Sequence, residues 1–73
     1  MLELDLHGTN HNEAQFLVDQ FIYKGISRGE HEIRVITGNS DRMREITMKS
    51  IKDHGLDFTV GDPYNMGYIR IFL

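Results

Sequence analysis

The spacing of the hydrophobic residues changes along the chain, and this change restricts the folds that the chain can adopt. Leu2, Leu4 and Leu6 alternate with polar residues, which is the pattern of a strand with one buried face. Between residues 14 and 21 the apolar positions instead fall at helical spacing. A strand pattern followed directly by a helix pattern predicts an α/β fold.

Cap and turn residues separate six elements. Each expected helix follows a residue that favours the N-cap and precedes a glycine suited to a left-handed C-terminal turn. The expected elements are a strand at residues 2–7, a helix from Asn10 or Asn12 to about Gly29, a strand at 33–36, a helix from Ser40 or Asp41 to Gly55, a strand at 58–60, a turn at 61–65 and a strand at 68–73.

This order restricts the topology of the sheet. Two successive strand–helix–strand units favour right-handed crossovers and a mostly parallel sheet. The short turn before the last strand makes the final pair antiparallel. We therefore expect an α/β two-layer sandwich of order β-α-β-α-β-β, with a four-stranded mixed sheet and both helices on one face. At 73 residues, the chain is expected to form a single domain, residues 1–73.

Composition excludes several classes of protein. The chain has no cysteine, which excludes disulfides and thiolate metal sites and fits a reducing compartment, so we expect a cytoplasmic location. No apolar run approaches the roughly 20 residues of a membrane span, so no membrane partner is expected. The net charge of −3 differs from that of a strongly basic nucleic-acid binder. Any affinity for nucleic acid should therefore depend on shape.

The first strand carries two side chains suited to acid–base chemistry. If its leucines face the helices, Asp5 and His7 share the opposite face near the carboxyl end of the strand. Ligands of open α/β sheets bind beyond the carboxyl ends of parallel strands. An Asp and a His at this spacing are nevertheless more often an ordinary surface pair.

The second strand also ends in a candidate site. It runs into Thr37, Gly38, Asn39 and Ser40, directly before a helix. Exposed amides at a helix N-terminus attract phosphate, and the first turn of this helix adds two arginines. These arginines are Arg42 and Arg44.

The bare face of the sheet should carry aromatic and basic side chains. Arg34 is expected to share that face with Asp5 and His7, and Arg70 lies between Tyr68 and Phe72 in the last strand. Such a surface suits stacking on unpaired bases and contact with phosphates. An exposed aromatic face is equally typical of a dimer interface, so a weak homodimer is the alternative.

Three segments in order resemble the Smr (small MutS-related) domain family. They are LDLHG at residues 4–8 with Glu13 and Ala14 downstream, VITG at residues 35–38, and Asn65 and Gly67 before the final strand. The resemblance spans essentially the whole chain. It implies a fold similar to the C-terminal domain of a bacterial translation initiation factor, and activity as a nuclease or a nucleic-acid-binding module.

The resemblance also assigns roles to residues. Asp5 and His7 match the catalytic motif, Thr37 and Gly38 match the second motif, and Gly8 would let a phosphate approach the backbone. Asp5 would orient the imidazole or hold a divalent cation, Mg²⁺ or Mn²⁺, when one is used. Candidate phosphate contacts are Gly8, Thr37, Gly38, Asn39, Ser40, Arg34, Arg42, Arg44 and Arg70.

One departure from the family keeps three functions open. The second motif usually reads TGxG, whereas Ser40 stands at the second glycine. The first hypothesis is an endonuclease acting on RNA or on structured or nicked DNA. The second is a module that binds nucleic acid without cleaving it, and the third is a protein-interaction or dimer module.

Overall fold

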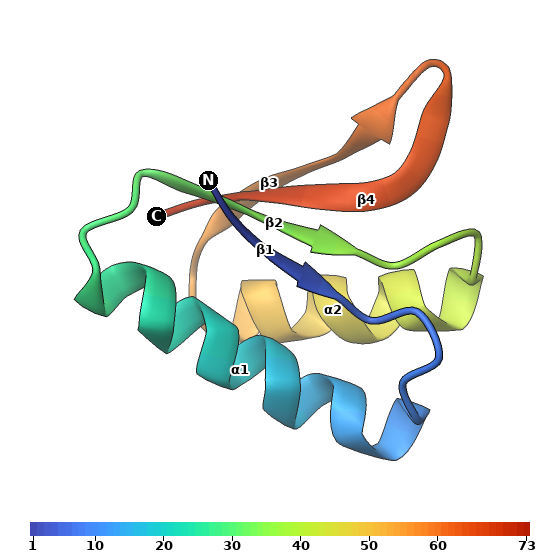
Figure 1. Cartoon of the computed structure of the whole chain (residues 1–73), viewed down its shortest axis with the longest axis horizontal. Helices are drawn as coiled ribbons and strands as arrows, with labels where there is room; N and C mark the ends of the chain where they lie inside the picture. Colours follow the sequence, from blue (N-terminus) through green and yellow to red (C-terminus); the bar gives the residue numbers. More distant parts are fainter.

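The computed structural model describes all 73 residues and contains the six predicted elements in the predicted order. Figure 1 shows their arrangement. The elements are β1 (Leu2–Asp5), α1 (His11–Ser27), β2 (Glu32–Ile36), α2 (Asp41–Asp53), β3 (Asp57–Asp62) and β4 (Asn65–Phe72).

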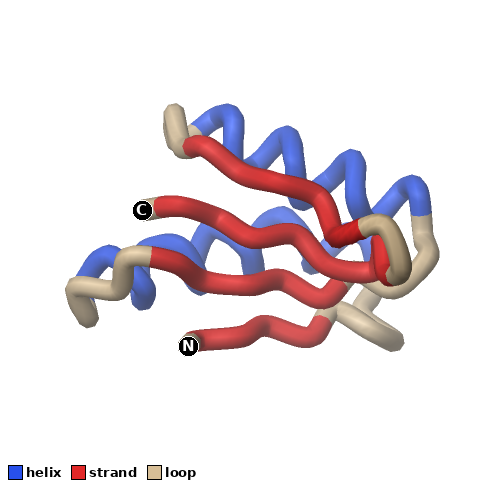
Figure 2. Tube along the Cα trace, turned by 90° about the horizontal axis from the view of Figure 1, so that it is seen from above, coloured by secondary structure: helices blue, strands red, loops and turns tan.

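The strands form one sheet, and both helices cover the same face of it (Figure 2). This confirms the two-layer sandwich with a mixed sheet. The strand order is β1-β2-β4-β3, with β1 parallel to β2 and with β4 antiparallel to both of its neighbours. The expectation of a mostly parallel sheet was wrong for the pairings, because β4 inserts between β2 and β3.

The inner position of β4 agrees with the burial of its side chains. Ile69 and Ile71 are fully buried, so β4 belongs inside the sheet. In β3 the alternate residues Asp57 and Thr59 are exposed, which suits an edge strand. The more apolar strand therefore takes the inner place, although it comes last in the chain.

Both helices begin at residues that the sequence indicates. The Asn10 side chain accepts a hydrogen bond from the Asn12 N–H at 2.9 Å, and the Ser40 hydroxyl accepts one from the Met43 N–H at 3.1 Å. Gly29 follows α1 with a φ of +69°, a conformation that favours glycine. The helix limits were therefore predictable from local sequence.

The core lies between the helices and the inner face of the sheet. It is formed by eleven buried apolar side chains: Leu6, Ala14, Val18, Phe21, Ile22, Ile33, Val35, Met43, Ile51, Ile69 and Ile71. A polar cluster joins the two helices, where Asp19 accepts a hydrogen bond from the Ser50 hydroxyl and lies 3.1 Å from His54 Nε2.

The turn between β3 and β4 is shorter than predicted. Only Pro63 and Tyr64 separate the strands, because Asp62 and Asn65 pair as the last residues of the ladder. Asp62 Oδ1 accepts hydrogen bonds from the N–H groups of Tyr64 and Asn65, both at 2.8 Å. Gly61 accompanies an irregularity in the pairing and has a φ of +54°.

Candidate nucleic-acid interface

The carboxyl ends of β1 and β2 bring two candidate loops together. Asp5 is paired with Ile36 in the parallel ladder, and the Leu6 N–H donates to the Ile36 carbonyl at 2.9 Å. Figure 1 shows that the loops following β1 and β2 lie at the same end of the sheet. Each loop leads into the N-terminus of a helix, so the positive ends of two helix dipoles lie together at the carboxyl ends of β1 and β2.

Asp5 and His7 are close together, although not as two side chains on one strand face. β1 ends at Asp5, and His7 lies in the turn that follows. The Asp5 carboxylate accepts a hydrogen bond from the His7 backbone N–H at 2.8 Å. The expected strand-face pair is therefore replaced by a turn in which Asp5 fixes the backbone and the exposed imidazole makes no hydrogen bond.

Gly8 makes this turn possible. Its φ is +78°, in the left-handed region, and the Thr9 N–H donates to the Leu6 carbonyl at 2.9 Å to close the turn. A Cβ at Gly8 would meet nothing within 4 Å, so the space beside this glycine is open. A phosphate can approach the backbone there.

The loop after β2 is partly committed to internal bonds. The N–H groups of Thr37 and Gly38 both donate to the Gly67 carbonyl, at 2.9 and 3.0 Å, and Thr37 is buried. Neither amide is free for a ligand, which corrects the expectation that the amides of this whole loop are exposed. The amides of Asn39 and Ser40 make no hydrogen bond within the chain, and they remain available.

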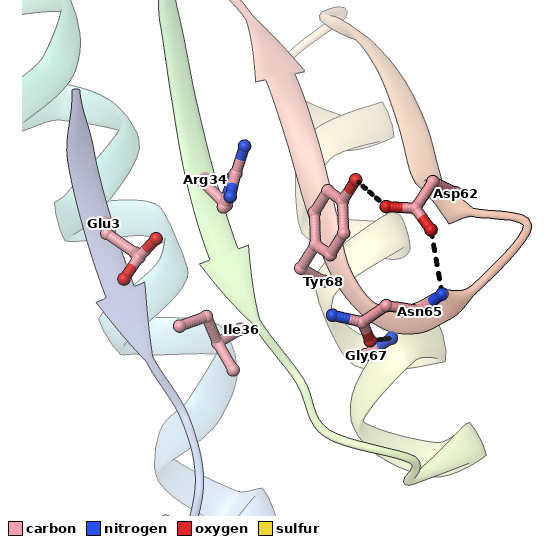
Figure 3. A pocket seen from close by; sticks show the side chains of 7 residues that line it. All are labelled: Glu3, Arg34, Ile36, Asp62, Asn65, Gly67 and Tyr68. Atoms are coloured by element: carbon pink, nitrogen blue, oxygen red, sulfur yellow. Dashed lines mark hydrogen bonds between the residues drawn. The ribbon is translucent and has the colours of Figure 1, made fainter.

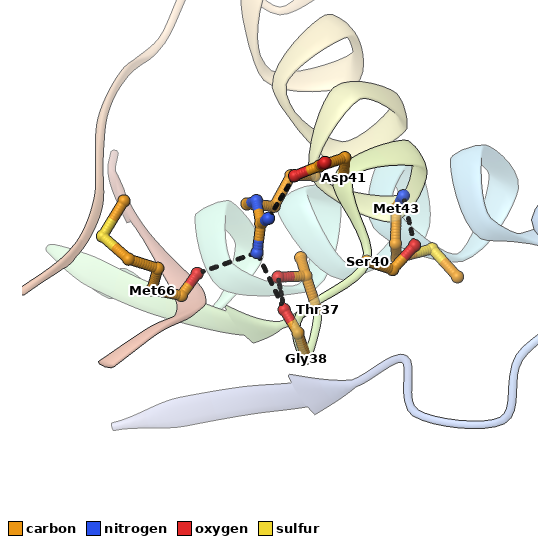
Figure 4. A network of polar contacts seen from close by, with 7 residues as sticks. Thr37, Gly38, Ser40, Asp41, Met43 and Met66 are labelled. Atoms are coloured by element: carbon orange, nitrogen blue, oxygen red, sulfur yellow. Dashed lines mark hydrogen bonds and ion pairs between the residues drawn. The ribbon is translucent and has the colours of Figure 1, made fainter. Parts of the chain in front are cut away.

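The Arg44 side chain also bonds to other parts of the protein and is not free for a ligand. Its Nη1 donates to the carbonyls of Gly38, at 3.1 Å, and Met66, at 3.3 Å, and its Nη2 pairs with Asp41. Figure 4 shows the carbonyls of Gly38 and Met66 facing each other across this contact. The Arg44 side chain is only 16% exposed, so the expected phosphate contact is instead a structural tie between the loop and β4.

The other arginines differ in how free they are. Arg42 is 65% exposed and has only a surface contact with Glu45 at 3.4 Å. Arg70 lies 3.4 Å from the Thr59 hydroxyl, and 3.9 Å from Glu32, on the outer face of the sheet. Arg42, two residues after Ser40 in the chain, is thus the candidate phosphate contact that the protein itself engages least.

Arg34 lies on the bare face, as predicted, but its registered neighbour in β1 is Glu3 and not Asp5. Its guanidinium lies 4.6 Å from the centre of the Tyr68 ring. Arg34 forms no ion pair, and its Nε is buried without a hydrogen-bond partner. This arginine therefore serves a different part of the surface from the Asp5–His7 turn.

A pocket of about 380 Å³ opens on the bare face beside Arg34 (Figure 3). Its lining residues come from all four strands: Glu3, Arg34, Ile36, Asp62, Asn65, Gly67 and Tyr68. Glu3, Ile36 and Asp62 were not singled out from the sequence. The alternation of β1 placed Glu3 on this face, whereas nothing local indicated that the hairpin would complete the pocket.

Hydrogen bonds favour the ionised form of Asp62, which lines the pocket together with Tyr68. The Tyr64 N–H, the Tyr68 hydroxyl and the Asn65 N–H all donate to Asp62 and hold the pKa of its carboxyl below the ordinary 3.8. The same bond to Asp62 raises the pKa of the Tyr68 hydroxyl above 10.0. Asp62 is therefore ionised and Tyr68 neutral at physiological pH.

The chain holds no group of three or more His, Asp or Glu side chains arranged to bind a metal ion. Mg²⁺ commonly binds through one or two carboxylates together with substrate phosphates. Asp5 is a single carboxylate, and it fits binding of a cation that is shared with a phosphate. Neither helix is long and apolar enough to cross a membrane.

The chain is thus a small α/β sandwich in which the free N–H groups of Asn39 and Ser40, before α2, suit a phosphate group. The chain belongs to the Smr domain family, whose model matches residues 4–66. Members of this family bind nucleic acid, and nucleases are among them.

The structural comparison agrees with this assignment. The fold is similar to the crystal structure of the Smr domain of MutS2 from Thermus thermophilus, with a TM-score of 0.89 and 22% sequence identity. The match covers 100% of this chain and 98% of that one. No curated protein matches the chain.

Proposed function

We propose that this domain is an endonuclease that cleaves phosphodiester bonds of RNA or of structured or nicked DNA. The observation that carries the proposal is the position of the Asp5–His7 turn beside the loop after β2. The Leu6–Ile36 hydrogen bond joins the two segments at 2.9 Å. The imidazole and the free amides of that loop therefore lie together at the carboxyl ends of β1 and β2. A phosphate bound there would lie next to a general acid or base.

His7 is the proposed general base or acid. An imidazole can donate or accept a proton through its ring nitrogens, and the exposed ring of His7 makes no hydrogen bond that would block it. The backbone amides of Asn39 and Ser40, together with Arg42, would stabilise the charge on the phosphate oxygens. Thr37 and Gly38 would act indirectly, because their bonds to Gly67 hold the loop in place.

Asp5 has two proposed roles that can be separated. One carboxylate oxygen accepts the His7 N–H and fixes the turn. In its second role, the negative charge of the Asp5 carboxylate would attract a divalent cation that is shared with the phosphate. Asp5→Asn keeps an oxygen for the turn and removes the charge, whereas Asp5→Ala removes both.

The test measures cleavage of labelled structured RNA and of supercoiled DNA, with and without Mg²⁺ or Mn²⁺. His7→Ala should lower the rate by about 10²–10⁴-fold, the range for loss of a general acid or base. His31→Ala is the matched control, because His31 is exposed in the α1–β2 loop and its side chain makes no hydrogen bond. Asp5→Asn should lose cleavage without losing thermal stability.

Other outcomes select the other hypotheses. Salt-sensitive binding without cleavage, unchanged in His7→Ala, would indicate a nucleic-acid-binding module. Association of the chain with itself that is lost in Phe72→Ser would indicate a dimer module. Cleavage that survives in both His7→Ala and Asp5→Asn would overturn the assignment of the site.

A further inference from the structure

The pocket on the bare face contains opposite charges that do not pair. Glu3 and Arg34 are direct neighbours in the parallel ladder of β1 and β2. Neighbouring opposite charges on adjacent strands commonly attract each other. Here no ion pair within 4.0 Å joins them, and the Glu3 carboxylate accepts no hydrogen bond from the chain. The structure therefore leaves a donor group and an acceptor group on either side of an open space.

A third polar group is also unused. Asn65 Oδ1 accepts the Gly67 N–H at 2.8 Å, whereas its Nδ2 makes no hydrogen bond. Figure 3 shows this amide nitrogen pointing into the pocket from the side opposite Glu3. Asp62 and Tyr68, in contrast, are bonded to each other at 2.9 Å. The free groups are thus one carboxylate, one guanidinium and one amide donor.

The walls favour a flat ligand. The Arg34 guanidinium lies over the Tyr68 ring at 4.6 Å, and Ile36 supplies an apolar surface between the strands. Unpaired bases stack on guanidinium planes as well as on aromatic rings, and here the Arg34 guanidinium, which covers the Tyr68 ring, supplies the plane. The lining contains two carboxylates, those of Glu3 and Asp62, against a single arginine, and this charge disfavours a phosphate as the occupant.

We propose that this pocket binds an unpaired guanine base. Guanine presents two adjacent donors, N1–H and N2–H, which one carboxylate such as Glu3 can accept together. Its O6 accepts from Asn65 Nδ2, the free amide donor of the pocket. Adenine, cytosine and uracil each place an acceptor beside their donor, so a carboxylate accepts only one bond from them.

The pocket adjoins the proposed cleavage site through Ile36, the registered partner of Asp5, so this inference rests on the proposed function and deepens it. Glu3 precedes Asp5 by two residues on the same face of β1, a separation of about 6.5–7 Å. Ile36 lines the pocket and is also the registered partner of Asp5. A guanine held here would lie close to the phosphodiester bond to be cleaved.

The test measures binding, independently of cleavage, by fluorescence anisotropy with short uridine-rich oligonucleotides, RNA and DNA, that carry one guanine, adenine or inosine. Gel analysis after each titration checks that the oligonucleotide is intact. Guanine should bind about tenfold more tightly than adenine, with inosine, which lacks the N2 amine, in between. Glu3→Gln should remove most of this preference, whereas Glu30→Gln, at the opposite end of the sheet, should keep it.

The outcomes separate this inference from the proposed function. Equal affinity for guanine and adenine would overturn it even if the domain cleaves nucleic acid. A guanine preference without cleavage would support it and contradict the nuclease. Amide chemical shifts of Glu3, Arg34 and Asn65 in NMR spectra should move on addition of GMP or dGMP and not of AMP. Shifts of these amides with protein concentration alone would overturn it, because they would mark an interface between copies.

Discussion

Arg44 donates a hydrogen bond from Nη1 to the carbonyl oxygen of Gly38 at 3.1 Å, and so reaches back from α2 to the loop that precedes it. The same nitrogen lies 3.3 Å from the Met66 carbonyl in β4. One guanidinium thus holds the loop between β2 and α2 against β4. Arg42, two residues earlier in α2, points to solvent. These two arginines should respond differently to removal.

Arg44→Ala should destabilise the fold by about 1–3 kcal/mol, because two carbonyls lose a charged donor. Arg42→Ala should change stability by less than about 0.5 kcal/mol, as expected of an exposed side chain. It should instead weaken nucleic-acid binding and reduce the salt dependence of that binding by about one phosphate contact. Urea unfolding and a salt titration of binding measure both effects. Equal losses of stability in the two variants would contradict this division of roles.

Gly61→Ala should be the most damaging of the glycine substitutions at positive φ. An added Cβ would lie 2.4 Å from the Asn65 carbonyl oxygen and 2.7 Å from the Met66 Cα, both backbone atoms that cannot move away cheaply. The left-handed conformation alone costs about 1–3 kcal/mol for other residues. Gly29→Ala is the control, because it has the same backbone strain with nothing within 4 Å. Urea unfolding should show a clearly larger loss for Gly61→Ala.

Ser40→Gly tests whether the departure from the family motif matters. Ser40 has a φ of −83° and a ψ of 114°, an extended conformation that needs no glycine. The substitution removes the bond to the Met43 N–H and should cost a few tenths of a kcal/mol, whereas Ser40→Ala should cost about 1 kcal/mol. Cleavage should be unchanged in Ser40→Gly. A large gain in cleavage would show that the serine side chain obstructs the substrate.

The elements of the fold were predictable because their signals are local. Asn10 and Ser40 cap the helices through bonds to amides two or three residues away, and such contacts depend on neighbouring sequence alone. The position of β4 between β2 and β3 was not predictable in this way. It depends on the burial of Ile69 and Ile71 in the common core. Strand order is a property of the packed sheet and not of any single segment.

The candidate site shows the same division. The sequence correctly indicated the loops that meet at the sheet edge, because parallel strands end together. It did not indicate that the N–H groups of Thr37 and Gly38 would donate hydrogen bonds to the Gly67 carbonyl. Nor did it indicate that the Arg44 side chain would donate one to the Met66 carbonyl. These bonds join segments more than twenty residues apart, and only the placement of the hairpin creates them. Tertiary contacts therefore decided which candidate groups remain free for a ligand.

The hairpin should make stability depend on pH in the acid range. Three donors, the Tyr64 N–H, the Tyr68 hydroxyl and the Asn65 N–H, hold the pKa of Asp62 below its ordinary value of 3.8. A carboxyl with a lowered pKa in the folded state stabilises the fold above its unfolded pKa. That contribution is lost as the pH falls through the lower, folded pKa.

Asp62→Asn removes this charge and leaves a side-chain oxygen for the turn. The difference in free energy of unfolding between the wild type and Asp62→Asn should stay constant from neutral pH down to about pH 5 and shrink below about pH 4. Urea unfolding at a series of pH values measures it. Asp57→Asn is the control, because Asp57 lies in the same strand and its side chain accepts no hydrogen bond. A difference between wild type and Asp62→Asn that persists unchanged at the lowest pH would show that the Asp62 charge does not stabilise the hairpin.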